Sequence, residues 1–181
     1  MNKQRLAIDM DDVMAFTVKH IVDRYENEFG YQLTDLDLAG KLVEDAVPVE
    51  HRQLVLDWIH TPGFYRYLPV MAEAQSVVYD LNKHYDVFVV SAANLIPSSV
   101  PEKLEWLGRN FDFIDVRNTV FCGHKYIINA HFMIDDHVKN LSGFDGKGIL
   151  FDAHHNVYQN AQQLGFQRTQ GWGQVADYLL N

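Results

Sequence analysis

The sequence contains short apolar runs that each stop abruptly at a polar residue. Three of them occupy residues 6–8, 87–90 and 132–134, directly before Asp9, Ser91 and Asp135. Two further runs, at residues 119–122 and 149–151, have the same character. Strands that are apolar without alternation are typical of a sheet covered on both faces. These runs therefore predict the strands of a buried parallel sheet.

Helical patterns separate several of the predicted strands. Apolar residues follow helical spacing at 74–81, before the second strand, and at 101–107, after it. A final helix is predicted near residues 174–180. Because strands that alternate with helices favour a parallel sheet joined by right-handed crossovers, we expect a Rossmann-like α/β fold.

The segment between the first two strands has a different pattern. From about residue 16 to residue 72 no good strand is found, but amphipathic helical stripes occur at 18–29 and 54–59. Gly30 follows the first stripe at the position of a helix C-cap. We interpret residues 16–72 as a small α-helical cap inserted after the first strand, on an α/β core formed by residues 1–15 and 73–181.

Composition limits the kind of protein. A length of 181 residues suits one domain with a modest insertion, and a net charge of −9 disfavours nucleic-acid and anionic-membrane surfaces. The single cysteine, Cys122, excludes an intramolecular disulfide, and its apolar neighbours predict a buried thiol. With no signal-peptide pattern and no membrane-length apolar run, we expect a cytoplasmic protein without a nucleic-acid polymer or membrane as partner; the sequence leaves the oligomeric state open.

Polar residues gather at the predicted carboxyl ends of the strands, where open parallel sheets bind ligands. They are Asp9, Asp11, Asp12, Ser91, Asp135 and Asp136, with Lys125 in a nearby loop. Crowded carboxylates repel one another, and Mg²⁺, which prefers oxygen ligands and phosphate, relieves that repulsion. One carboxylate could attack phosphorus while another acts as acid and base, with the lysine and the hydroxyl holding the phosphoryl oxygens. The cluster therefore predicts a phosphoryl-transfer site.

The order of these residues resembles the motifs of the haloacid dehalogenase superfamily of phosphatases. The resemblance lies in Asp9-Met10-Asp11-Asp12-Val13, Ser91, Lys125 and Ile134-Asp135-Asp136. More closely, the chain is similar to the 5′(3′)-deoxyribonucleotidases and their bacterial relatives in the segments IDMDDVMA (8–15), GFYRYLPVM (63–71), GHKYIINAHFMIDDH (123–137) and GILFDAHHN (148–156). The resemblance implies a magnesium-dependent phosphatase that hydrolyses nucleoside monophosphates through an aspartyl-phosphate.

The resemblance also implies a role for each motif residue. Asp9 would be the nucleophile and a metal ligand, and Asp11 the general acid/base, which also gives its backbone carbonyl to the metal. Ser91, the amide of Ala92 and Lys125 would hold the phosphate. For the third metal ligand we favour Asp136 over Asp135, because it lies eleven residues after Lys125, as the ligand does in the resembled family, although the reverse assignment stays open.

Three positions depart from the resembled pattern. Asp12 stands where the superfamily usually has a glycine, Ala92 where the deoxyribonucleotidases have a second hydroxyl residue, and Gly123 where they have an arginine. These differences leave the phosphatase residues intact but weaken the case for any particular nucleotide.

The predicted cap is expected to select the substrate. Phe16, Phe64 and Tyr65 are our candidates for stacking on a base, since Phe16 and Phe64 lie near the junctions between cap and core. Trp58 is interpreted as a residue of the cap interior. His124 and His137 flank the predicted site and could contact substrate, whereas His154 and His155 are interpreted as loop residues.

Three alternatives to a nucleotidase remain open from the sequence. The first is a phosphatase of another small metabolite, such as a sugar phosphate. The second is a signalling receiver domain, which is disfavoured because a receiver is shorter, needs no cap and carries its phosphorylated aspartate on a later strand. The third is a relative that binds nucleotide without turnover, which is disfavoured because no motif residue is missing.

Overall fold

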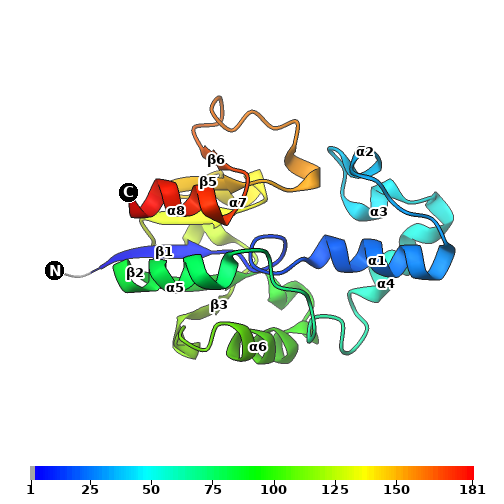
Figure 1. The fold of residues 1–181 in the computed structure, drawn as a ribbon, viewed down its shortest axis with the longest axis horizontal. Coiled ribbons are helices and arrows are strands. Elements are labelled where there is room, and N and C mark those ends of the chain that lie inside the picture. The colour runs from blue at the N-terminus through cyan, green and yellow to red at the C-terminus, as the bar shows by residue number, and fades with distance from the viewer. Residues whose placement is uncertain (1–2) are drawn as a thin grey trace.

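A computed structural model, which describes residues 3–181, shows one six-stranded sheet in which all strands are parallel (Figure 1). The strand order across the sheet is β3-β2-β1-β4-β5-β6. The strands are β1 (Gln4–Ile8), β2 (Tyr85–Ser91), β3 (Thr119–Phe121), β4 (Phe132–Asp135), β5 (Lys147–Phe151) and β6 (Gln167–Thr169). The predicted Rossmann-like parallel sheet is confirmed, with β1 at its centre.

Each of the inner strands packs against apolar side chains on both of its faces. On one face Leu6 and Ile8 of β1 join a core with helices α5 and α8. On the other face Ala7 joins a second core that contains Leu141 and Phe144. Because consecutive residues of a strand point to opposite faces, burial on both sides requires the unbroken apolar runs seen in the sequence.

The helices flank the sheet and extend beyond one end of it. They are α1 (Thr17–Phe29), α2 (Asp35–Leu38), α3 (Val43–Ala46), α4 (Arg52–Trp58), α5 (Ala74–His84), α6 (Ser99–Asn110), α7 (Val138–Leu141) and α8 (Trp172–Leu180). Helices α1 to α4 follow β1 and stand beyond the end toward which the β1 arrow points (Figure 1). The helices predicted from periodicity are present, and the interpretation of residues 16–72 as a separate cap stays a prediction.

The end of α1 shows why its boundary was predictable. Gly30 has φ 66°, in the left-handed region, and its amide donates to the carbonyl of Glu26. A glycine adopts this conformation without steric cost, which makes it the common residue after the last helical turn.

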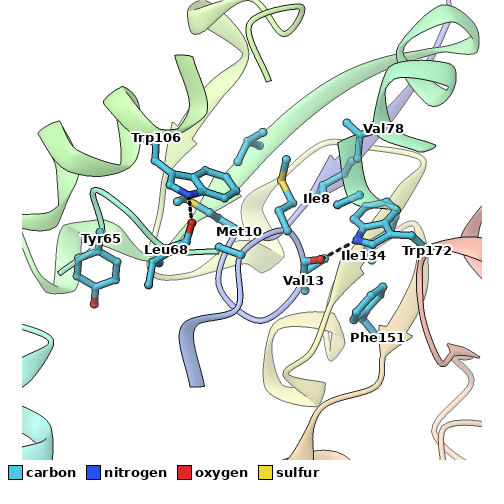
Figure 2. Close-up of a cluster of buried hydrophobic side chains, with 14 of the residues drawn as sticks. Ile8, Met10, Val13, Tyr65, Leu68, Val78, Trp106, Ile134, Phe151 and Trp172 are labelled. Atoms are coloured by element: carbon cyan, nitrogen blue, oxygen red, sulfur yellow. Dashed lines mark hydrogen bonds between the residues drawn. The ribbon is translucent and has the colours of Figure 1, made fainter. Parts of the chain in front are cut away.

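Two buried tryptophans tie the chain on either side of α1–α4 to the core (Figure 2). The indole N–H of Trp106 donates to the carbonyl of Leu68 at 2.7 Å, and that of Trp172 donates to the carbonyl of Val13 at 2.8 Å. The two connecting segments also bind each other, since the amide of Phe16 donates to the carbonyl of Pro69 at 2.9 Å. Both connections to the helical segment are therefore held by helices of the core, α6 and α8.

Several details differ from the sequence prediction. Strand β6 was not predicted, because its residues, Gln-Arg-Thr, form no apolar run at this edge of the sheet. Cys122 is half-buried rather than buried, since it lies just after the short edge strand β3 and its thiol donates to the carbonyl of His124 at 3.3 Å. Among residues 3–181 no helix is both long and apolar enough to span a membrane.

Candidate active site

A buried lysine joins two carboxylates at the carboxyl end of the sheet. The Nζ atom of Lys125 lies 2.6 Å from an oxygen of Asp9, after β1, and 2.6 Å from an oxygen of Asp135, at the end of β4. Lys125 is only 2% exposed. The predicted convergence of these three residues, which are far apart in the sequence, is therefore present in the fold.

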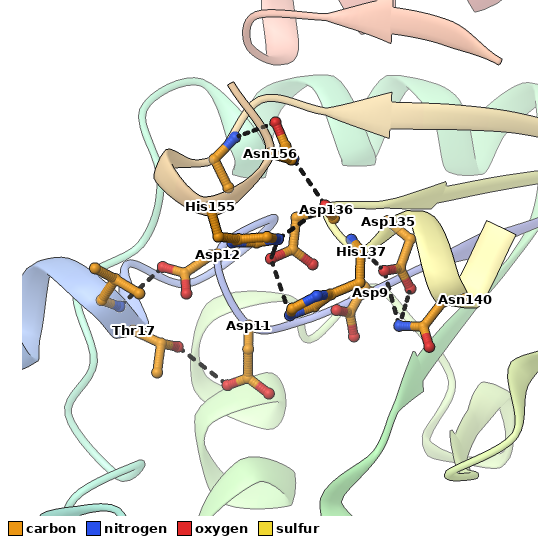
Figure 3. Close-up of polar contacts among 12 residues, drawn as sticks. Asp9, Asp11, Asp12, Thr17, Asp135, Asp136, His137, Asn140, His155 and Asn156 are labelled. Carbon is orange, nitrogen blue, oxygen red and sulfur yellow. Dashed lines mark hydrogen bonds and ion pairs between the residues drawn. The ribbon is translucent and has the colours of Figure 1, made fainter. Parts of the chain in front are cut away.

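The acidic pair at the end of β4 has two unlike members (Figure 3). Both oxygens of Asp135 have protein donors: Lys125, the amide of His137 and the side-chain amide of Asn140. Asp136 is also buried, but its Oδ1 has no hydrogen-bond partner among residues 3–181. Because an unpaired buried carboxylate oxygen is costly, Asp136 is the member whose surroundings call for a further ligand.

The charges at this site are not balanced by the protein alone. Burial is the main cause that raises the pKa of Asp9 to about 6, although Lys125 opposes the rise. Burial, together with the charges of Asp9 and Asp135, also raises the pKa of Asp136. Burial disfavours the charge of Lys125, but the attraction of its two carboxylate neighbours is stronger, so the pKa of Lys125 is raised.

These residues fit a divalent cation. Oxygen atoms of Asp9, Asp135 and Asp136 all lie within 4.8 Å of one another. A hard cation such as Mg²⁺ takes carboxylate oxygens, and its charge would favour the ionised carboxylates that burial and mutual repulsion disfavour here. The free Oδ1 of Asp136 supplies an oxygen that the protein has not used.

A second lysine lies at the site and was missed in the sequence. Lys103 of α6, 3% exposed, donates to Oδ2 of Asp11 and to the hydroxyl of Ser91, the latter at 3.0 Å. The other oxygen of Asp11 accepts from the hydroxyl of Thr17 at 3.0 Å. One signal was available, because Lys103 stands one helical turn before Leu107 and so lies on the apolar face of α6.

Asp12 has the backbone conformation that a glycine would favour. Its φ is 51°, and its carboxylate accepts from the amide of Val18 at 2.9 Å in the first turn of α1. Burial raises the pKa of Asp12 to about 7, although the Val18 amide opposes the rise. The side chain therefore binds the start of α1 instead of crowding the turn, and aspartate is among the few residues that tolerate this conformation.

A cavity of about 970 Å³ lies between the end of the sheet and the helical segment. Phe16 and Tyr65 line it, together with Asp12, Asp136 and His137. Of the predicted base contacts, Phe16 and Tyr65 thus face the cavity. Phe64 is outside its lining and packs edge-on against His20 and Tyr65, with ring centroids 5.1 and 4.9 Å apart. Trp58 is buried, as expected for an interior residue.

His155 lies in a loop, as predicted, and it also contacts Asp136. We interpreted it as a loop residue, and it does lie in a short turn after β5, but its Nε2 donates to the carbonyl of Asp136 at 3.1 Å. Its ring stacks on that of His137, with centroids 4.1 Å apart. Burial is the main cause that lowers the pKa of both imidazoles, to about 4 for His137. His124 is exposed, and His154 lines the cavity.

The remaining predicted phosphate ligands lie at the carboxyl end of β2, where Ser91 is the last residue of the strand and Ala92 follows it. Ser91 is fully buried and Ala92 half-buried. At Gly123, where the resembled family has an arginine, an added Cβ would lie 3.5 Å from the side chain of Asn94. Asn94 thus lies beside this position.

Comparisons with known proteins agree with this arrangement. The family described as 5′ nucleotidase, deoxy (pyrimidine), cytosolic type C protein matches residues 3–181. A relative from Staphylococcus epidermidis is 43% identical over 179 residues, which cover 99% of this chain and 97% of the relative. The 5′(3′)-deoxyribonucleotidase of Bacillus subtilis is 36% identical over 181 residues, which cover 98% of this chain and 99% of the relative.

Solved structures show the same fold at low sequence identity. A hydrolase of the haloacid dehalogenase-like family from Streptococcus pneumoniae superposes with a TM-score of 0.65 at 8% identity, covering 97% of this chain and 98% of that one. A haloacid dehalogenase-like protein from Agrobacterium tumefaciens gives a TM-score of 0.62 at 12% identity, covering 99% and 98%. From its family match and its curated relatives, the chain belongs to the family of cytosolic type C deoxy-specific 5′ nucleotidases.

Proposed function

We propose that this protein is a magnesium-dependent 5′(3′)-deoxyribonucleotidase that releases phosphate from nucleoside monophosphates through an aspartyl-phosphate on Asp9. The observation that carries the proposal is the buried Lys125, 2.6 Å from Asp9, beside an Asp136 oxygen with no partner among residues 3–181. The lysine contacts one carboxylate, and a neighbouring carboxylate has a free oxygen. These two features are expected of a nucleophile that lies beside a bound cation.

The chain's own residues can perform both steps of the hydrolysis. A carboxylate oxygen of Asp9 attacks phosphorus, and the bond between phosphorus and the sugar oxygen breaks. Asp11 gives a proton to the departing sugar oxygen. It then takes a proton from the water that attacks the aspartyl-phosphate, which releases phosphate and restores Asp9.

Lys103 would help to hold the substrate phosphate beside Asp11. In the structure its ammonium group lies between Asp11 and Ser91. A phosphate bound at Ser91 would compete with Asp11 for this ammonium group, since both are anionic acceptors. Substrate binding would thereby release the Asp11 carboxyl group from the lysine, so that it can approach the departing sugar oxygen.

We propose Asp9, Asp136 and the backbone carbonyl of Asp11 as the protein ligands of Mg²⁺. The ion would supply positive charge to the transferring phosphoryl group. Asp135 is assigned a supporting role, because its oxygens are already bound by Lys125, His137 and Asn140.

The nucleotide assignment is supported by the cavity and by the relatives. Phe16 and Tyr65 line the cavity together with Asp136, one of the proposed metal ligands, and aromatic rings there can pack against a base. The Bacillus subtilis relative and one from Clostridium acetobutylicum, 32% identical over 172 residues, are both named 5′(3′)-deoxyribonucleotidase. Action in the cytoplasm is part of the proposal, supported by the cytosolic type in the description of the family.

The test is phosphate release with Mg²⁺ from deoxy- and ribonucleoside monophosphates, sugar phosphates and a chromogenic phosphate ester, with Asp9→Asn as the control. Selective turnover of nucleotides, lost in the variant, is the expected result. Turnover of sugar phosphates or the chromogenic ester without nucleotides would instead support the alternative of another small phosphorylated metabolite. The family match leaves the receiver interpretation without support.

A further inference from the structure

Asn156 is a buried side chain whose hydrogen-bonding groups are all used. It is 1% exposed. Its Nδ2 donates to the carbonyl of Asp136 at 2.7 Å and to that of Phe151 at 2.8 Å. Its Oδ1 accepts from the amide of Ala153 at 3.3 Å and from Arg168 at 2.8 Å. With two donors and two accepted bonds, the amide is saturated.

The two carbonyl groups belong to the ends of neighbouring strands. Phe151 is the last residue of β5, and Asp136 directly follows β4. The register between these strands pairs Asp135 with Leu150, so the ladder stops one residue before each carbonyl. Asn156 joins the two strands just beyond that point. Its contact with the carbonyl of Asp136 fixes the backbone that carries the Asp136 side chain (Figure 3).

Further contacts hold Asn156 itself in place. Arg168 of β6 donates to both the side-chain and the backbone oxygen of Asn156, at 2.8 and 3.1 Å. Arg168 is in turn paired with Asp152, with 2.5 Å between Nε and Oδ1. His155 adds a second donor, at 3.1 Å, to the Asp136 carbonyl. The edge strand β6 is thus connected through Asn156 to the residue after β4.

We infer that Asn156 is a positioning residue that sets the Asp136 carboxylate for the cation, an inference that rests on the proposed function. Mg²⁺ demands nearly ideal octahedral geometry, so a ligand on a displaced backbone binds it poorly. No donor among residues 3–181 binds Oδ1 of Asp136. The orientation of that oxygen therefore depends largely on the position of the backbone. Loss of partners that orient metal ligands typically weakens metal binding about 10- to 100-fold.

The test compares Mg²⁺ binding by the full-length wild-type protein and Asn156→Ala, measured by calorimetry without nucleotide. We expect binding to weaken about 10- to 100-fold. In turnover assays the half-saturating Mg²⁺ concentration should rise by a similar factor, the KM for nucleotide at saturating Mg²⁺ should change much less, and kcat should largely recover there. Equal Mg²⁺ affinity in the two folded proteins would overturn the inference.

Asn118→Ala is the matched control. Asn118 is half-buried, and its Nδ2 donates to the carbonyl of Val87 at 2.9 Å, near the amino end of β2. Its removal should lower the thermal unfolding temperature without weakening Mg²⁺ binding, because it is remote from the carboxyl ends of the strands. An equal loss of Mg²⁺ affinity in this control would show that general destabilisation, not positioning, is responsible.

If Asn156→Ala does not fold, Arg168→Gln provides the same test. It removes a donor to Asn156 while leaving the Asn156 side chain, so Mg²⁺ affinity should fall at least threefold; unchanged affinity would contradict the inference. Wild-type protein that hydrolyses nucleotides without binding Mg²⁺ would overturn the magnesium part of the proposed function instead, so the two failures are distinguishable.

Discussion

The ammonium nitrogen of Lys103 lies 3.0 Å from the hydroxyl oxygen of Ser91, and the same nitrogen contacts Asp11. Helix α6 thus brings a lysine to the end of β2, whereas Lys125 contacts Asp9 and Asp135. A transferred phosphoryl group accumulates negative charge on its oxygens, and two buried ammonium groups could stabilise it.

Replacing Lys103 with methionine should impair turnover. The change removes one charge-assisted contact, about 1.5–3 kcal/mol, so kcat/KM for a nucleotide should fall about 10- to 100-fold in steady-state assays. Lys83→Met is the control, since Lys83 pairs with Asp80 on the exposed surface of α5. Unchanged kinetics of Lys103→Met would exclude Lys103 from phosphate binding.

Asp9→Asn should abolish turnover. An amide is a poor nucleophile toward phosphorus, and we expect kcat to fall by at least about a thousandfold. Phosphate release measures the loss, and calorimetry with a nucleoside monophosphate shows whether the site still forms. Full activity in this variant would overturn the assignment of the nucleophile.

Removal of divalent metal should stop the reaction. Without a cation, Lys125 alone offsets the repulsion among Asp9, Asp135 and Asp136, and the transferring group loses its main neutralising charge. Activity in excess EDTA should fall to background and return when Mg²⁺ is restored in excess over the chelator. Persistent hydrolysis in EDTA would remove magnesium from the mechanism.

The Asp12→Asn variant should change how stability depends on pH. Burial raises the Asp12 pKa from 3.8 to about 7, so between these values the folded chain keeps a proton that the unfolded chain has released. The free energy of unfolding contributed by Asp12 therefore falls as pH rises through this window. Asparagine keeps the acceptor for Val18 without the charge.

The variant's advantage in unfolding free energy over the wild-type protein should thus grow from pH 4 to pH 8. Urea denaturation at several pH values, with metal removed by chelator, measures this difference. A difference that stays constant across the range would show that Asp12 does not carry a buried charge.

The sheet and the main site were predictable because their signals are local. Each strand that precedes Asp9, Ser91 or Asp135 is a continuous apolar run, and a parallel sheet brings the ends of its strands to one edge. The stripe that forms α1 and its Gly30 cap are likewise adjacent in sequence. Local sequence patterns and the topology of a parallel sheet together therefore predict most of the residues that surround Lys125.

The parts that were missed depend on contacts between distant residues. Helices α2 and α3 have four residues each, too few for a periodicity to register. Lys103 reaches the site only because α6 packs where its side chain contacts Asp11 and Ser91, 92 and 12 residues away in sequence. His155 reaches Asp136 only through the fold of the loop after β5, which no spacing rule describes.

The central position of β1 has a consequence for how the chain is made. Gln4 pairs with Tyr85 in β2, and Leu6 pairs with Phe132 in β4. Strand β1 leaves the ribosome before β2 and β4, yet it gains its second neighbour only after Phe132 has been synthesised. Until then a nascent chain carries a hydrophobic strand with an open edge, a template for aggregation. Catalytic competence therefore arrives late in synthesis, and chains truncated before β4 should be inactive.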